Sequence, residues 1–101
     1  MKVVYIAGSY RAKTIFGRIV NTYKARKRAI KYWKAGYVVI CPHTNSFNFD
    51  GTAPDEIFLK GYLELVCRSD IIVMLPGWKK SAGSRDEHKK AKRLQKIIIY
   101  E

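Results

Sequence analysis

Four short runs of apolar residues divide the chain at regular intervals. They lie at residues 3–7, 37–41, 70–75 and 97–100, they are rich in Val and Ile, and the third is apolar after its first residue, Asp70. Within each run, apolar residues follow one another and do not alternate with polar ones, which is typical of strands buried on both faces of a parallel sheet. The pattern therefore predicts four buried strands.

Three stretches between these strands, at about residues 16–34, 55–67 and 84–95, have the spacing of amphipathic helices. Gly36 follows the first helix as a C′ residue does. We expect this helix to face the core with its large apolar residues and to direct its cations elsewhere. Those apolar residues are Phe16, Ile19, Val20, Tyr23, Ile30 and Trp33. Segments 43–55 and 78–83 are predicted to be loops.

The resulting order of elements, βαβαβαβ, predicts the α/β class and a single domain over residues 1–101. We expect a parallel sheet of four strands in the order 2-1-3-4, with helices on both faces in three layers. In such sheets the ligand crevice lies outside the carboxyl ends of the strands. Three loops, at 8–15, 42–55 and 75–84, are predicted to meet there.

The charge of the chain indicates which partners it favours. It carries 20 Lys and Arg against 8 Asp and Glu, a formal net charge of +12. The first acidic residue is Asp50, so the first half of the chain is exclusively basic. This charge favours nucleic acid, nucleotides or phosphorylated metabolites as partners, although a solvated Lys-rich surface explains scattered lysines equally well.

Several other classes of protein are disfavoured. The apolar start ends at Gly8, too early for a signal peptide, and no run approaches the roughly 18 apolar residues of a membrane span. We therefore expect a cytoplasmic protein with no membrane partner. Cys41, Cys67, His43 and His88 lack metal-ligand spacing, so we expect buried thiols, no metal and no cofactor.

The first loop begins with Gly8-Ser9-Tyr10-Arg11, directly after a predicted strand. A glycine there lets backbone amides approach a ligand, and a hydroxyl with a guanidinium suits phosphate oxygens. The glycine spacing matches neither a Walker loop nor the dinucleotide fingerprint, and an ordinary turn uses the same residue types. The loop is thus either a candidate phosphate site or an ordinary turn.

The third and second loops supply candidate carboxylates. In Ser81-Ala82-Gly83-Ser84-Arg85-Asp86-Glu87, one interpretation makes Ser84 and Glu87 a capping box at a helix start. The other places Glu87 in the first helical turn facing the crevice, where amide dipoles keep it ionised as a nucleophile. Asp50 and Asp55 in the second loop have two interpretations. In the first, they bind a sugar hydroxyl or act as an acid. In the second, Asp50 is a turn residue and Asp55 is a helix-start charge.

Taken together, these segments resemble the nucleoside 2-deoxyribosyltransferase-like superfamily, which includes nucleoside 5′-monophosphate N-glycosidases. The resemblance rests on Tyr5-Ile6-Ala7-Gly8-Ser9-Tyr10-Arg11, on Asp70, and on Ser81-x-Gly83-Ser84-x-x-Glu87 followed by Ala91. An uncharacterised phage and bacterial branch is similar at Cys41-Pro42-His43, Phe49-Asp50-Gly51 and Pro76-Gly77-Trp78. Each motif is short, but their order and spacing extend over nearly the whole chain.

The resemblance implies a flavodoxin-like sheet in a homodimer or larger assembly. It also implies that Glu87 attacks C1′ of a deoxyribosyl unit and releases the base, after which water or a second base completes hydrolysis or transfer. The Gly-Ser-x-Arg loop and the Ser-x-Gly turn would then cradle the 5′-phosphate. With their neighbours, the candidate substrate-binding residues are Gly8, Ser9, Arg11, His43, Ser81, Gly83 and Ser84.

The chain departs from this family at two points. The family usually has an Asp before a Leu in the helix preceding the third strand, where this chain has Tyr62 before Leu63. Tyrosine, with a pKa of about 10, is a weaker acid and is bulkier, so either Asp50 or Asp55 substitutes for the missing Asp or the chemistry is reduced. The sequence also stops after the last predicted strand, where family transferases continue, which is compatible with binding without turnover.

We therefore expect a nucleotide-handling protein that cleaves or transfers the N-glycosidic bond of a (deoxy)nucleoside 5′-monophosphate. Its candidate catalytic residues are Glu87, Asp50, Asp55 and Tyr62. The alternative is a non-catalytic module that binds nucleotides or nucleic acid through its basic first helix.

Overall fold

The four predicted strands form one sheet in the computed structural model, which describes all 101 residues. The sheet is entirely parallel and its order is β2-β1-β3-β4, as the sequence predicts. The elements along the chain are β1 (Val3–Ala7), α1 (Ile15–Lys34), β2 (Val38–Ile40), α2 (Pro42–Asn45), α3 (Asp55–Cys67), β3 (Ile71–Met74), the 3-10 helix η1 (Trp78–Lys80), α4 (Ala82–Arg93) and β4 (Ile97–Tyr100).

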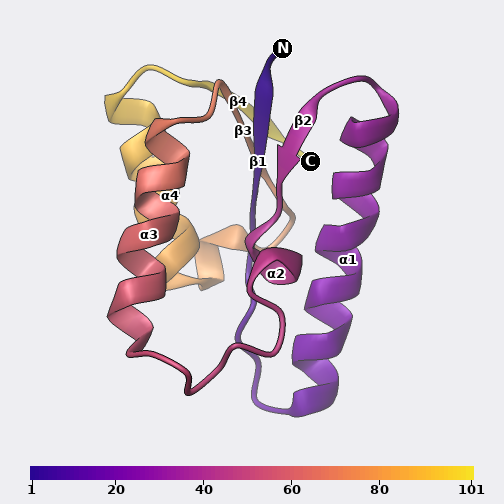
Figure 1. Cartoon of the computed structure of the whole chain (residues 1–101), viewed down its shortest axis with the longest axis vertical. Coiled ribbons are helices and arrows are strands. Elements are labelled where there is room, and N and C mark those ends of the chain that lie inside the picture. Colours follow the sequence, from indigo (N-terminus) through magenta and orange to yellow (C-terminus); the bar gives the residue numbers. More distant parts are fainter.

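Helices cover both faces of the sheet and give three layers, with α1 on one face and α3 and α4 on the other (Figure 1). The two central strands, β1 and β3, are buried on both faces, because alternate residues face opposite helical layers. Toward α1 they present Val4, Ile6, Ile71, Val73 and Leu75. Toward α3 and α4 they present Tyr5, Ala7, Ile72 and Met74. This three-layer α/β arrangement confirms the predicted fold class.

The expected orientation of α1 is wrong. The helix buries Ala25, Ala29 and Tyr32 against the sheet and leaves most of its predicted core face open to solvent. Two alanines let the helix backbone approach the strands closely, whereas a face of bulky aromatic residues would hold it further away. The Tyr32 hydroxyl also donates a 2.8 Å hydrogen bond to the Glu101 carboxylate, which fixes the end of the helix beside β4. The residues left more than half exposed are Phe16, Ile19, Tyr23 and Trp33.

The ends of the other helices also correct the sequence-based expectation. Residues 42–45 form the short helix α2, where a loop is expected from residue 43, because Pro42 occupies the first helical turn. Helix α4 begins at Ala82, two residues earlier than expected, since Ser81 is its N-cap and accepts a 3.2 Å hydrogen bond from the Ser84 amide. The predicted capping box therefore does not form. Glu87 is free to face the cavity described below.

Two backbone features agree with the sequence. Gly36 has a φ of 94° directly after the C-cap of α1, as expected of a C′ glycine. Asp70 precedes β3, and its carboxylate accepts a 2.8 Å hydrogen bond from the Val3 amide, which aligns the beginnings of β1 and β3. No helix combines the length and the apolar character needed to cross a membrane.

Candidate functional site

A cavity of about 830 Å³ lies at the carboxyl ends of β1 and β3, where the three predicted loops meet. Figure 1 shows these loops gathered at the lower end of the sheet, between the first turns of α1 and α3. The cavity is lined by all eleven residues that the sequence nominates: Gly8, Ser9, Arg11, His43, Asp50, Asp55, Tyr62, Ser81, Gly83, Ser84 and Glu87. Parallel strands bring together groups that are far apart in the chain, and this placement at the strand ends follows the general rule for such sheets.

Glu87 lies one turn into α4, half-buried between the helix and the sheet. The Tyr5 hydroxyl of β1 donates a hydrogen bond to its Oε2 atom. Burial raises the pKa of Glu87 to about 7, the hydrogen bond from Tyr5 opposes that rise, and the neighbouring Asp86 charge adds to it. Desolvation thus opposes the ionisation that the amide dipoles of the first turn are expected to favour. At neutral pH both the acid and the carboxylate are populated.

Tyr5 is fully buried, and the sequence gives little sign of its role. Burial raises its pKa well above the usual value, and the charge of Glu87 raises it further. Tyr5 therefore keeps its proton at neutral pH and acts as a permanent donor to Glu87. The signals in the sequence are its place at the start of the motif Tyr5-Ile6-Ala7-Gly8-Ser9-Tyr10-Arg11 and the presence of a phenol in a strand that is otherwise aliphatic.

The turn at the start of α4 offers a hydroxyl with no partner in the protein. Ser84 is 2% exposed, yet its Oγ atom makes no hydrogen bond. The Ser81 hydroxyl beside it is occupied as the N-cap of the helix. A buried polar atom without a partner costs free energy unless a ligand or solvent satisfies it. The Ser84 hydroxyl is thus available to a ligand, whereas the Ser81 hydroxyl holds the turn in place.

The first loop is held tightly against the end of β3. A Cβ atom added at Gly8 would lie 2.8 Å from Leu75 Cδ1 and 2.9 Å from Leu75 Cβ, so this position requires glycine. The Ser9 carbonyl accepts a 3.0 Å hydrogen bond from Nε2 of His43, which is 4% exposed. Burial lowers the pKa of His43, so its ring is neutral at neutral pH, with the proton on Nε2 and an unpartnered Nδ1. His43 positions the backbone of this loop.

Ion pairs connect the first loop and α1 to the second loop and α3. Arg11 pairs with Asp55, and Arg18 of α1 pairs with Asp50 at 3.2 Å. The Tyr10 hydroxyl also donates a 3.1 Å hydrogen bond to Asp50. The predicted phosphate ligand Arg11 and the predicted carboxylate Asp55 therefore neutralise one another, and Arg18 neutralises Asp50. Arg18 was missed from the sequence because it is one of many cations in α1.

Tyr62 stands where the resembled family has an aspartate, and its hydroxyl makes contacts within the protein. It interacts with the Ser46 hydroxyl and lies 3.5 Å from the Pro42 carbonyl oxygen. These contacts join α3 to the segment around α2, so Tyr62 shapes the wall of the cavity.

No group of three or more His, Cys, Asp or Glu side chains is arranged so that it could hold a metal ion. Burial of Cys41 raises the pKa of its thiol.

A family model described as a domain of unknown function, DUF4406, matches residues 2–100. The chain therefore belongs to this family. No curated protein matches the chain.

Proposed function

We propose that this member of the DUF4406 family binds a deoxynucleoside 5′-monophosphate in the cavity and cleaves or transfers its N-glycosidic bond, with Glu87 as the nucleophile. The observation that carries this proposal is the half-buried Glu87 carboxyl, which has a pKa of about 7 and is held by the buried Tyr5 hydroxyl at the wall of an 830 Å³ cavity. Such a perturbed carboxyl in a cleft is typical of a catalytic group.

The reaction has two steps. The Glu87 carboxylate forms a bond to C1′ of the sugar while the C1′–N bond breaks, and the base leaves with the electron pair and takes up a proton from solvent. Water then attacks C1′ of the glycosyl ester, or a second base does so, and the Glu87 carboxylate is regenerated. Because Tyr5 engages only Oε2, the Oε1 atom is available to attack.

Tyr5 suits the role of a positioning residue for this nucleophile. A hydrogen bond to the charged form favours ionisation, so Tyr5 raises the fraction of carboxylate that burial alone would leave. The rigid central strand β1 supplies this donor, and α4 supplies the acceptor. The pair thus fixes one carboxylate oxygen and leaves the other free.

The phosphate would lie at the turn that begins α4. The partner-free Ser84 hydroxyl and the amides of the first turn of this twelve-residue helix are suitable donors for an anion. Arg11 would exchange its exposed partner Asp55 for the phosphate. The base would contact the apolar part of the lining, which includes Phe49, Phe58 and Leu59.

The test is release of free base from a panel of deoxynucleoside 5′-monophosphates, followed by chromatography. We expect wild type to release base, and Glu87→Gln to lower the rate by about a thousandfold or more, because an amide cannot replace a carboxylate nucleophile. Glu64→Gln is the matched control, since Glu64 is exposed on α3 and outside the cavity. Equal rates for wild type and Glu87→Gln, or no base release from any substrate, would overturn the proposal.

A further inference from the structure

The outer surface of α1 carries a continuous stripe with the spacing of a coiled-coil seam. Its positions alternate at intervals of three and four residues, and we call them the α1 seam: Phe16, Ile19, Tyr23, Arg26, Ile30 and Trp33. Phe16 is 75% exposed, and Ile19, Tyr23 and Trp33 are each more than half exposed. Inside the molecule, α1 packs mainly on β1, β2 and α2, and every seam residue except the half-buried Ile30 is exposed.

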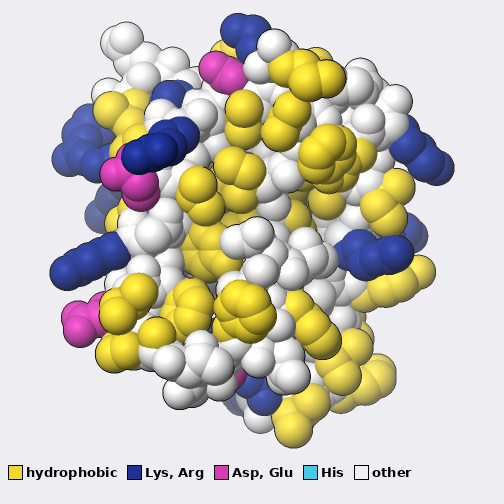
Figure 2. All heavy atoms as spheres, in the orientation of Figure 1, with side chains coloured by type: hydrophobic (Ala, Val, Ile, Leu, Met, Phe, Trp, Pro, Cys, Tyr) yellow, Lys and Arg dark blue, Asp and Glu magenta, His cyan; other side chains and the backbone are white.

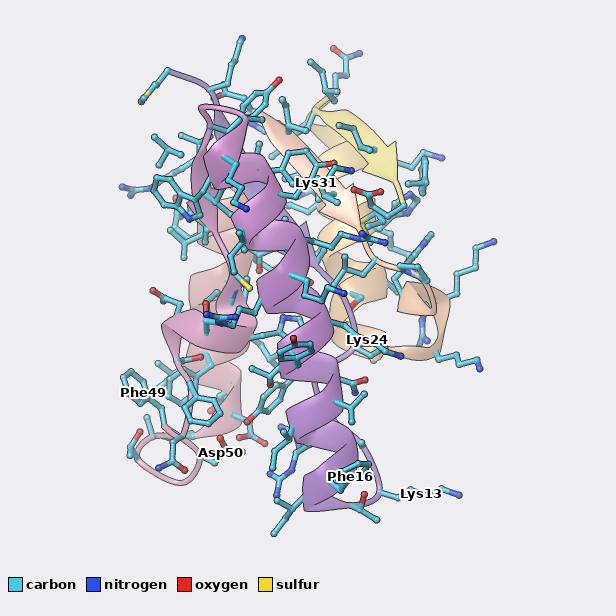
Figure 3. All side chains as sticks on the ribbon, turned by 90° about the vertical axis from the view of Figure 1, so that its right-hand side faces the viewer. Lys13, Phe16, Lys24, Lys31, Phe49 and Asp50 are labelled. Atoms are coloured by element: carbon cyan, nitrogen blue, oxygen red, sulfur yellow. The ribbon has the colours of Figure 1, made fainter.

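The figures agree with this assignment. Figure 3 looks directly at the outer surface of α1 and shows Phe16 and Lys24 on it, while Lys31 pairs with Glu101 at 3.2 Å. In the space-filling view, hydrophobic side chains are open to solvent along the edge of the molecule that α1 forms, with cations between them (Figure 2). A 20-residue helix spans about 30 Å, which is long enough for a partner helix to lie along it.

A basic stripe runs beside the seam. It consists of four exposed lysines, again at intervals of three and four residues, of which Lys31 already pairs with Glu101 at 3.2 Å: Lys24, Lys27, Lys31 and Lys34. Helix α1 contains no acidic residue. In coiled coils, charges that flank an apolar seam select the partner, and a charged residue within the seam needs an opposite charge across it. The surface complementary to the seam is therefore an apolar stripe flanked by carboxylates, with one carboxylate opposite Arg26.

Three other occupants fit these observations less well. In a symmetric pairing of two copies, the same surface lies on both sides, so the apolar seams would meet but every charge that the two helices bring to the interface would be a cation. A membrane would have to accept Arg26 within the apolar stripe, at a cost in free energy. Nucleic acid would gain phosphate contacts from the lysines, but Ile19 and Ile30 offer it neither charge nor an aromatic face.

We propose that the α1 seam is a docking surface for an acidic amphipathic helix of a partner protein. The partner helix lies along α1, buries its apolar stripe against the seam and directs its carboxylates toward Arg26 and the lysine stripe. This surface is separate from the cavity, since none of the seam residues lines it. Docking thus leaves the proposed catalytic site open.

The probe is a designed helical peptide of roughly three heptads, with Leu along its stripe, Glu on both flanks and one Glu opposite Arg26. We expect the full chain to bind it one to one by calorimetry, with affinity falling about tenfold or more between roughly 50 and 500 mM salt. Tyr23→Asp should lower the affinity by about tenfold or more. Ile57→Asp, at an equally exposed position on α3, should leave it unchanged. Circular dichroism verifies that each variant is folded, and Phe16→Asp replaces Tyr23→Asp if it is not.

Charge exchange makes the test specific. The double variant Lys27→Glu/Lys34→Glu should lose the Glu peptide and bind a counterpart peptide with Lys on its flanks. Failure of wild type to bind the Glu peptide, or equal binding of both peptides by wild type, would overturn the proposal. Three other results would also overturn the proposal: self-association of the chain, binding to single-stranded DNA, or binding to anionic vesicles. Each counts if Tyr23→Asp abolishes that association and the Glu peptide does not compete with it.

Discussion

At the scale of single residues, the cavity depends on a balance between burial and hydrogen bonding at Glu87. Burial favours the neutral acid and the Tyr5 hydroxyl favours the carboxylate, and the outcome is a pKa of about 7. The sequence identifies Glu87 through its motif, but it could not predict this pKa. The donor is 82 residues away in the chain, and only the folded sheet brings it to Glu87.

The raised pKa makes stability depend on pH. The Glu87 carboxyl titrates near 4.5 when unfolded and near 7 when folded, so the native state is stabilised while the group is protonated. This stabilisation is lost as pH rises toward and through 7. Glu87→Gln should therefore exceed wild type in stability by less than about 1 kcal/mol at pH 5 and by up to about 3 kcal/mol at pH 8. Urea unfolding of both proteins at the two pH values measures this. A difference that does not change with pH would contradict it.

Tyr5→Phe tests the other side of the balance. Removing the hydroxyl takes away the hydrogen bond that favours the carboxylate, so the pKa of Glu87 should rise above 7. The measurement is an NMR titration of the Glu87 side-chain carboxyl carbon in wild type and variant. Tyr100→Phe, which removes an exposed hydroxyl bonded to His88, serves as the control. An unchanged or lowered pKa in Tyr5→Phe would show that the pair does not act as described.

At the scale of elements, the sequence predicts where helices and strands lie better than how they face. The apolar runs are sufficient for the strands, because the buried central strands must be apolar on both faces. Apolar periodicity in α1 is real as well, but it does not say whether that face meets the sheet of the same molecule. Ala25 and Ala29 face the sheet because their small side chains allow the helix to approach it closely, and the larger residues remain on the outer surface.

The start of α4 shows the same limit on a smaller scale. Both Ser81 and Ser84 are suitable N-caps, and the sequence favours Ser84 because Glu87 follows three residues later. In the structure Ser81 is the cap. The choice leaves Ser84 without a partner, and it removes the structural alternative for Glu87 that the capping box offered.

Two serine variants follow from this assignment. Ser81→Ala removes a cap and should cost about 1 kcal/mol of stability. Ser84→Ala removes a buried hydroxyl that makes no hydrogen bond, so it should be neutral or slightly stabilising. Thermal denaturation of the two variants in parallel is sufficient as a measurement. The reverse ranking would restore the capping box and would weaken the case for Ser84 as a ligand.

At the scale of the whole molecule, the cavity and the outer surface of α1 differ in chemistry. The carboxyl ends of the strands collect the polar groups into one cavity, as the order of elements predicts. The outer surface of α1 collects cations and large apolar side chains, which composition alone could not locate. The formal charge of +12 favours anionic partners in general, and α1, which contains no acidic residue, carries part of this excess.

The pH dependence of kcat/KM for base release from a deoxynucleoside 5′-monophosphate tests the central claim most directly. A carboxylate nucleophile acts only when ionised, so kcat/KM should rise with pH, with a midpoint near 7, and should level off above it. Glu87→Gln should lose the activity at every pH, while Glu64→Gln should keep the wild-type profile. A kcat/KM that falls as pH rises through 7 would make Glu87 a proton donor instead, and a profile unchanged in Glu87→Gln would remove it from the reaction.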